Sequence, residues 1–187
     1  MKISKDRKID INKIFSKTTS KIICIKLIVD NYEIDELDLA ITKMNEAWNI
    51  LLATNKSLFK KLFSGIINRI FIRYDTKTGT YIPYFVLICI LKNKIAMQEY
   101  KLDILFYVSW LSTWARTLNC CKNVKVEWNY INKNIIKIVF DNFLKAPTYI
   151  AANQKSELII KQSLKHNRSI RYIGLFNRPI ELGVIER

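Results

Sequence analysis

Histidine and cysteine, the side chains that most often bind transition metals or act as nucleophiles, are scarce in this chain. His166 is the single histidine, and the four cysteines are Cys24, Cys89, Cys120 and Cys121. No two cysteines have a CxxC spacing, so the sequence predicts neither a zinc site nor a disulfide framework. A metal site that needs two histidines is excluded by composition alone.

Positive charge is the most abundant chemical feature of the sequence. Lys and Arg number 31 against 16 Asp and Glu, which gives a formal net charge of +15. Such an excess indicates a polyanionic partner, nucleic acid first and an anionic membrane surface second. The chain is also rich in Ile, Lys and Asn, as AT-rich genomes encode, and this bias alone would raise the charge.

The length and hydrophobic content predict one folded domain. The chain has 187 residues, of which 50% are hydrophobic and 25% charged. The apolar runs at 81–91 and 102–115 are shorter than the ~20 residues that cross a bilayer. We therefore expect a soluble, cytoplasmic protein without a membrane partner, with a basic N-terminal arm (1–20), a domain (21–178) and a C-terminal tail (179–187).

The elements alternate between strand and helix patterns. A run dense in Ile predicts a strand over 21–29, and apolar residues at spacings of three and four predict a helix over 35–54. Two β-prone runs, 66–74 and 81–91, are joined by a polar connection with Gly79 and predict an antiparallel hairpin. Further helices are expected over 57–63, 102–118, 134–145 and 156–165, and further strands over 124–128 and 169–173. This order predicts an α+β fold, an antiparallel sheet with packed helices.

The hairpin resembles a motif of the plasmid rolling-circle replication initiators, the Rep proteins. That family's metal-binding strand reads tyrosine-His-Pro-His-Phe-His and then an aliphatic run. The corresponding residues here are Tyr81, Ile82, Pro83, Tyr84, Phe85 and Val86. The likeness extends upstream through the strand and helix before the hairpin. Downstream it includes a tryptophan-containing helix at 110–118 and the stretch LKHNRSIRYIGLF at 164–176, so it covers roughly residues 20–178.

The resemblance implies an HUH-endonuclease-like domain with a ferredoxin-like or RRM-like core. In that family two histidines on the sheet hold a divalent metal, and a helix-borne tyrosine attacks a DNA phosphate. A tyrosine hydroxyl is a weak nucleophile near neutral pH, so the metal is needed to stabilise charge on the phosphoryl oxygens.

The family's metal positions carry other side chains in this sequence. Alternate residues of a strand share a face, so Ile82, Tyr84 and Val86 are expected to point together. Pairing of the two tyrosines that flank the hairpin connection would add Phe71 to that face. These four residues match the family's metal site but lack its ligands. The sequence thus predicts no cofactor, unless a divalent metal binds at an unrecognised site.

The nucleophile position has changed as well. In the stretch DNFLKAP, Ala146 occupies the place of the family's tyrosine. Tyr149 follows three residues later, but Pro147 is expected to end the helix between them. Tyr149 is therefore a weak candidate nucleophile, and the alternative is an aromatic ring that packs under a loop.

Basic and aromatic side chains supply the candidate DNA contacts. The candidate phosphate contacts are Arg69, Arg73, Lys77, Lys145, Arg168 and Arg171, although for any one of them a place on a solvated face is slightly favoured. Tryptophans could stack on unpaired bases, but helical spacing predicts that Trp48, Trp110 and Trp114 lie in the core. His166 is expected to cap helix carbonyls or touch phosphate, without a catalytic role.

Three functions remain open at this point. The first is a Rep-like protein that binds DNA, single-stranded or at a plasmid origin, and lacks nicking activity because of these replacements. The second is an active, divergent Rep nickase whose metal is held by oxygen ligands. The third is a basic structural protein with no DNA role. The replacements favour the first, and the sequence predicts no oligomeric state.

Overall fold

The computed structural model describes residues 21–92, 109–110, 112–113, 125–166 and 170–174. The expected N-terminal arm, the expected C-terminal tail and most of the expected helix over 102–118 lie outside the described residues.

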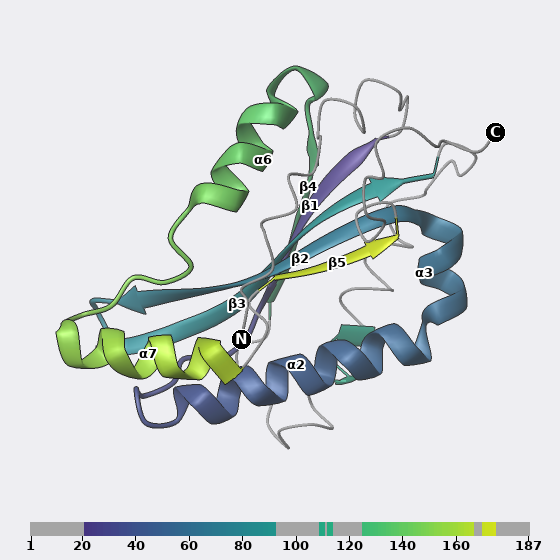
Figure 1. Ribbon diagram of the computed structural model, residues 1–187. Helices are drawn as coiled ribbons and strands as arrows, with labels where there is room; N and C mark the ends of the chain where they lie inside the picture. The colour runs from purple at the N-terminus through teal and green to yellow at the C-terminus, as the bar shows by residue number, and fades with distance from the viewer. Residues whose placement is uncertain (1–20, 93–108, 111, 114–124, 167–169, 175–187) are drawn as a thin grey trace, which may run out of the picture.

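Five antiparallel strands form one twisted sheet in the order β4-β1-β3-β2-β5 (Figure 1). The strands are β1 (Ile22–Ile28), β2 (Phe63–Asp75), β3 (Thr80–Leu91), β4 (Lys125–Ile131) and β5 (Ile170–Gly174). Every strand lies where the sequence pattern placed one, and the α+β class with an antiparallel sheet is confirmed.

The β2–β3 hairpin supplies two adjacent strands near the middle of the sheet. Its register pairs Tyr74 with Tyr81, and the rings lie 5.1 Å apart between centroids. Gly79 has a φ of +72° in the connection, a conformation that glycine adopts without steric cost. Its N–H donates to the Asp75 carbonyl at 2.8 Å, which closes the turn and fixes the register.

Three helices cover one face of the sheet, here called the helix face. They are α2 (Leu37–Thr54), α3 (Lys56–Leu62) and α7 (Gln154–His166). Figure 1 shows α7 beside the first turns of α2. The apolar stripe of α2 buries Trp48 completely against Phe85 of β3, with ring centroids 5.9 Å apart. Trp110 is also fully buried against Phe85, so the core positions expected for both tryptophans are confirmed.

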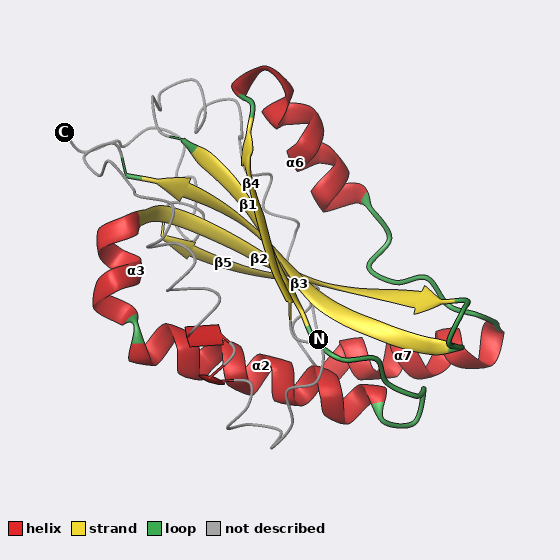
Figure 2. Cartoon of the chain, turned by 180° about the vertical axis from the view of Figure 1, so that it is seen from behind, coloured by secondary structure: helices red, strands yellow, loops and turns green. Residues whose placement is uncertain are grey.

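One helix, α6 (Ile136–Lys145), lies across the opposite face, as Figure 2 shows from behind. A short 3-10 turn, η2 (Lys133–Ile135), leads into it. Phe140 and Phe143 of α6 pack on isoleucines of the central strands and form a second, smaller core. A proline disfavours helical geometry in the residue before it. Ala146 is accordingly extended, with a ψ of 141°, and the helix ends before Pro147.

Among the described residues, no helix combines the length and the apolar character needed to cross a bilayer.

We call the sheet face that carries α6 the open face.

Candidate nucleic-acid interface

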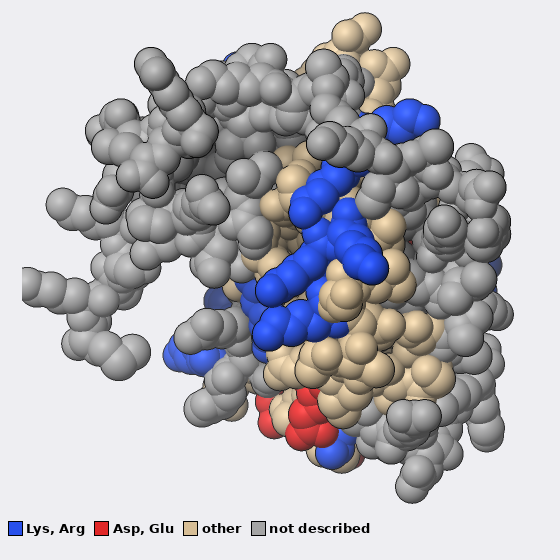
Figure 3. All heavy atoms as spheres, turned by 90° about the vertical axis from the view of Figure 1, so that its right-hand side faces the viewer, with Lys and Arg blue, Asp and Glu red and all other residues tan. Residues whose placement is uncertain are grey.

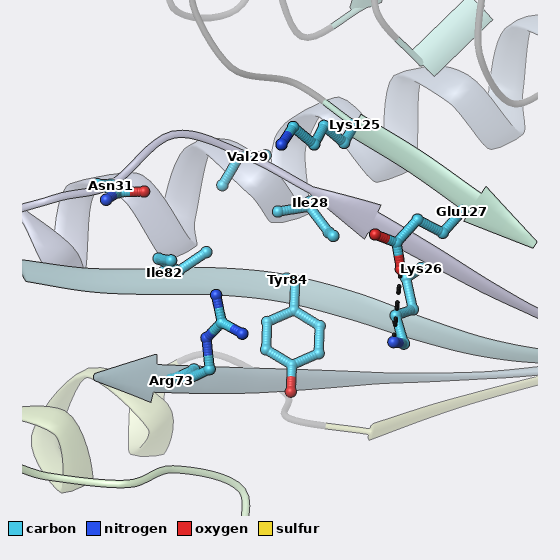
Figure 4. A pocket seen from close by; sticks show the side chains of 9 residues that line it. All are labelled: Lys26, Ile28, Val29, Asn31, Arg73, Ile82, Tyr84, Lys125 and Glu127. Atoms are coloured by element: carbon cyan, nitrogen blue, oxygen red, sulfur yellow. Dashed lines mark hydrogen bonds and ion pairs between the residues drawn. The ribbon is translucent and has the colours of Figure 1, made fainter. Parts of the chain in front are cut away.

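The part of the open face beyond α6 is hollowed into a groove of about 430 Å³ (Figure 4). Strands β1, β2, β3 and β4 contribute alternate residues to it, because residues opposite one another in the register share a face. The residues that line this sheet groove are Lys26, Ile28, Val29, Asn31, Arg73, Ile82, Tyr84, Lys125 and Glu127.

Cations dominate the polar lining of the sheet groove. Lys26, Arg73 and Lys125 are exposed, and Glu127 is the single carboxylate among the lining residues. Lys26 Nζ lies 3.5 Å from Glu127 Oε2, and both side chains are about half exposed, at 49% and 53%. Solvent weakens an ion pair of this kind, so its partners remain available to other ions. The groove therefore offers net positive charge to an anion.

Beside these cations, Tyr84 lines the groove as one member of an aromatic pair. Tyr84 stacks on Phe71 across the hairpin, with centroids 5.8 Å apart and planes inclined by 22°. The Phe143 ring of α6 packs against the Phe71 ring, with centroids 6.0 Å apart. Tyr84 is half-buried, and Figure 4 shows its ring beside the Arg73 side chain. The pairing of Phe71 with Tyr84 confirms that both lie on one face, as the strand periodicity predicted.

The positions that match the Rep metal site do not fit a divalent cation. Ile82, Tyr84, Val86 and Phe71 all project from the open face, and they present hydrocarbon and phenol groups. Positive charge at Arg73 beside them would repel a metal ion. Among the described residues, no three His, Cys, Asp or Glu side chains come together as a ligand set.

Arg69 does not lie at the surface, as expected for a phosphate contact. It lies inside the molecule and is only 9% exposed. Its guanidinium donates to the Phe143 carbonyl, to the Ala146 carbonyl at 2.7 Å and to Thr148 Oγ1 at 2.8 Å. The last carbonyls of a helix have no partner within the helix, and a cation also suits that end of the helix dipole. Arg69 therefore anchors the end of α6 to β2.

Arg171 also differs from expectation, because it points to the helix face. Its Nη1 donates to Asn49 Oδ1 at 2.6 Å and its Nη2 to Asn45 Oδ1 at 2.8 Å, both on α2. Lys77 is exposed at the hairpin tip, and Lys145 is exposed in the last turn of α6. Of the expected cations that are described, Arg73 lines the sheet groove, while Arg168 lies outside the described residues.

Sequence reasoning missed Lys26 and Lys125 as groove residues. Both sit on strands far from the hairpin in sequence, and the sheet register alone brings them beside Tyr84. A local signal was present for Lys26, since it interrupts an otherwise apolar strand at an outward position.

Tyr149 lies away from the sheet groove. It forms a bridge with Ile72, whose side chain belongs to the helix-face core, and its ring packs against that core. Its hydroxyl donates to Glu157 Oε1 at 3.2 Å. The hydrogen bond and charge of Lys161, followed by the Tyr149 hydroxyl, lower the pKa of the Glu157 carboxyl. This placement corresponds to the packing alternative rather than to a nucleophile in the groove.

The two described cysteines are poor nucleophiles. Cys24 lies on the open face next to Lys26 along the strand, and burial raises its thiol pKa while the Lys26 charge opposes the rise. Cys89 is fully buried, which raises its pKa much further. A raised pKa keeps both groups protonated near neutral pH, where the thiol is the unreactive form.

Fold and site together define an α+β protein whose antiparallel sheet carries a basic, partly aromatic groove on one face. No protein-family model matches this chain, and neither a curated protein nor a solved structure matches it. The groove and the resemblance of the hairpin sequence are therefore the features that indicate a function.

Proposed function

We propose that this protein is a DNA-binding relative of the plasmid rolling-circle initiators that lacks their nicking activity. One observation carries the proposal: the hairpin face that holds the metal in that family here holds the stacked pair of Phe71 and Tyr84. Three cations, Lys26, Arg73 and Lys125, border it. Cations of this kind attract phosphates, and an aromatic ring offers a stacking surface to an unpaired base.

The chain order of the sheet supports an HUH-like, ferredoxin-like core. Strands β1 to β4 follow the spatial order β4-β1-β3-β2, with α2 and α3 between β1 and β2. Trp110, from the connection between β3 and β4, packs on the helix face. These features agree with a split β-α-β-β-α-β arrangement, to which β5 is added beside β2.

The groove favours binding over cleavage of a single strand. A base can reach the Tyr84 ring only when it is unpaired, so single-stranded DNA is the preferred ligand. Cleavage would need a nucleophile and a charge-stabilising group, and the matching positions hold Ala146 and the aromatic pair. The protein would then act at a plasmid origin as a regulator or a decoy.

Binding of a labelled oligothymidylate of about 16 nucleotides, followed by fluorescence anisotropy, tests the proposal. Tyr84→Leu removes the stacking surface and is expected to weaken binding about 5- to 150-fold, whereas Tyr84→Phe keeps the ring and should bind like the wild type. Arg73→Gln should weaken binding and flatten its salt dependence, while Lys155→Gln on α7 serves as the charge-matched control.

Two results would contradict the proposal. If Tyr84→Leu bound oligothymidylate with unchanged affinity, the sheet groove would not be the binding site. A nicked product with a covalent tyrosyl adduct, formed from an origin oligonucleotide with manganese or magnesium, would show that the enzyme is active.

A further inference from the structure

A second cationic surface lies at the opposite end of the sheet from the sheet groove, around α3 (Figure 1). Three of the seven residues of α3 are lysines, and its first turn contains no acidic residue. Lys56, Lys60 and Lys61 are all exposed, while Phe59 and Leu62 hold the helix to the core.

Lys92 is hydrogen-bonded to α3, and Lys21 lies beside the end of β3 that precedes Lys92. The Lys92 N–H donates to the Leu62 carbonyl at 2.9 Å, and Lys92 Nζ donates to the Lys60 carbonyl at 2.6 Å. Lys21 lies on the adjacent strand end, where its carbonyl accepts from the Leu91 N–H at 2.9 Å. We call this surface the lysine end, and it comprises Lys21, Lys56, Lys60, Lys61 and Lys92. Figure 3 shows a group of Lys and Arg side chains gathered on this side of the molecule.

The local sequence supplies almost no countercharge to the lysine end. No Asp or Glu occurs within residues 47–74 or 76–98. Lys56 and Lys60 are four residues apart on one helix, where like charges repel and destabilise the helix. Five acidic residues instead precede or begin α2, at the far end of the sheet: Asp30, Glu33, Asp35, Glu36 and Asp38. The acidic residues before and at the start of α2 thus lie far from the lysine end.

We infer that the lysine end is a second nucleic-acid site, which binds the phosphate backbone of a duplex. Ammonium groups act as compact point charges and lack the planar fork that arginine uses to read base edges. The aromatic residue of α3, Phe59, is buried, so this helix offers no ring for an unpaired base. A duplex presents the densest row of phosphates, and its binding releases the most counterions per contact. This site does not depend on single-strand binding in the sheet groove.

The test compares two triple variants in a salt titration with a labelled duplex of mixed sequence. Lys56→Gln, Lys60→Gln and Lys61→Gln together remove three charges from the lysine end, and glutamine keeps a similar helix propensity. Lys137→Gln, Lys155→Gln and Lys165→Gln remove three exposed charges from α6 and α7 as the matched control. Circular dichroism checks that each variant is folded, and the pair Lys56→Gln with Lys61→Gln replaces the first triple if that variant does not fold.

The slope of log K against log salt is the decisive readout. If each lysine neutralises one phosphate, the slope of the lysine-end triple becomes shallower by about 2.7, and the slope of the paired variant by about 1.8. The control triple should keep the wild-type slope, and the lysine-end triple should keep its affinity for oligothymidylate. A wild-type slope in the lysine-end triple overturns the inference. The inference is also overturned if the wild-type protein binds phosphatidylserine-containing vesicles but does not bind the duplex.

Discussion

At the scale of single residues, Arg69 and Arg73 show how position decides the role of a charge. They are four residues apart on β2 and project from the same face. The last turn of α6 and the residues that follow it supply three oxygen acceptors to Arg69, whereas Arg73 lies beyond the helix and remains exposed. The two arginines look alike in the sequence, because the acceptors of Arg69 lie 74 to 79 residues later in the chain.

Replacing Arg69 with methionine should destabilise the fold substantially. The change leaves the carbonyls of Phe143 and Ala146 without their buried donor, and it removes the guanidinium that lies 4.8 Å from the centre of the Phe71 ring. We expect a loss of about 3 kcal/mol in the free energy of unfolding, measured in urea. Arg73→Met is the matched control on the same strand and should change stability by less than about 0.5 kcal/mol. Equal effects in the two variants would contradict the anchoring role of Arg69.

Alkylation of Cys24 should be slow at neutral pH. Because burial raises its thiol pKa, less thiolate is present at a given pH than in a free cysteine, whose pKa is about 8.5. The rate with iodoacetamide, followed by peptide mass spectrometry, should therefore rise at higher pH than for a free thiol. Lys26→Gln removes the charge that opposes the rise, so it should slow the reaction further. A faster reaction in this variant would contradict the assignment.

The raised thiol pKa values of Cys24 and Cys89 also determine how the stability of the protein changes with pH. As pH increases, the unfolded chain loses its thiol protons first, while folded Cys24 and Cys89 keep theirs. The unfolded state then binds fewer protons than the folded state, so the contribution of the two thiols lowers stability as pH rises above the unfolded pKa. Below that pKa, both states hold the protons and the contribution is constant.

At the scale of elements, the sequence predicts features that depend on the pattern within one segment. It does not predict those that depend on the register between distant strands. The spacing of apolar residues located α2, and the Gly-containing connection located the hairpin, because each pattern reports which face of its own segment is buried. The shared face of Phe71 and Tyr84 also followed from periodicity. The neighbours of Tyr84 on β1 and β4 did not, because strand order depends on contacts between distant segments. The placement of Arg171 against α2 was missed for the same reason.

The packing of α6 can be tested within that helix. Phe140 is fully buried on the open face, whereas Ile138 on the same helix is 61% exposed. Phe140→Ala should lower the free energy of unfolding by about 3–5 kcal/mol, because it removes buried contacts and leaves a cavity. Ile138→Ala should change it by no more than about 0.5 kcal/mol. If urea unfolding gave similar losses for both variants, α6 would not pack on the sheet as described.

At the scale of the whole molecule, the excess of positive charge acts on stability and on binding in opposite directions. With a formal charge of +15, the cations repel one another in the free protein. The same cations lower the free energy of a complex with DNA. Separation of the lysine end from the acidic start of α2 would also favour one orientation of the protein as it approaches a polyanion.

Raising the salt should therefore increase the stability of the free protein and decrease the extra stability that bound DNA adds. Raising the salt from about 0.01 M to about 0.15 M shortens the Debye length from ~30 Å to ~8 Å and screens the internal repulsion, so thermal unfolding of the free protein should shift to higher temperature. Duplex DNA at about 100 times its Kd should add about 2.7 kcal/mol of stability, and at a fixed DNA concentration this increment should shrink as salt weakens binding. Sucrose, which carries no charge, is the control and should leave the DNA increment unchanged. A DNA increment that persists across the salt series would mean that phosphate contacts do not hold the complex together, and it would count against both cationic sites.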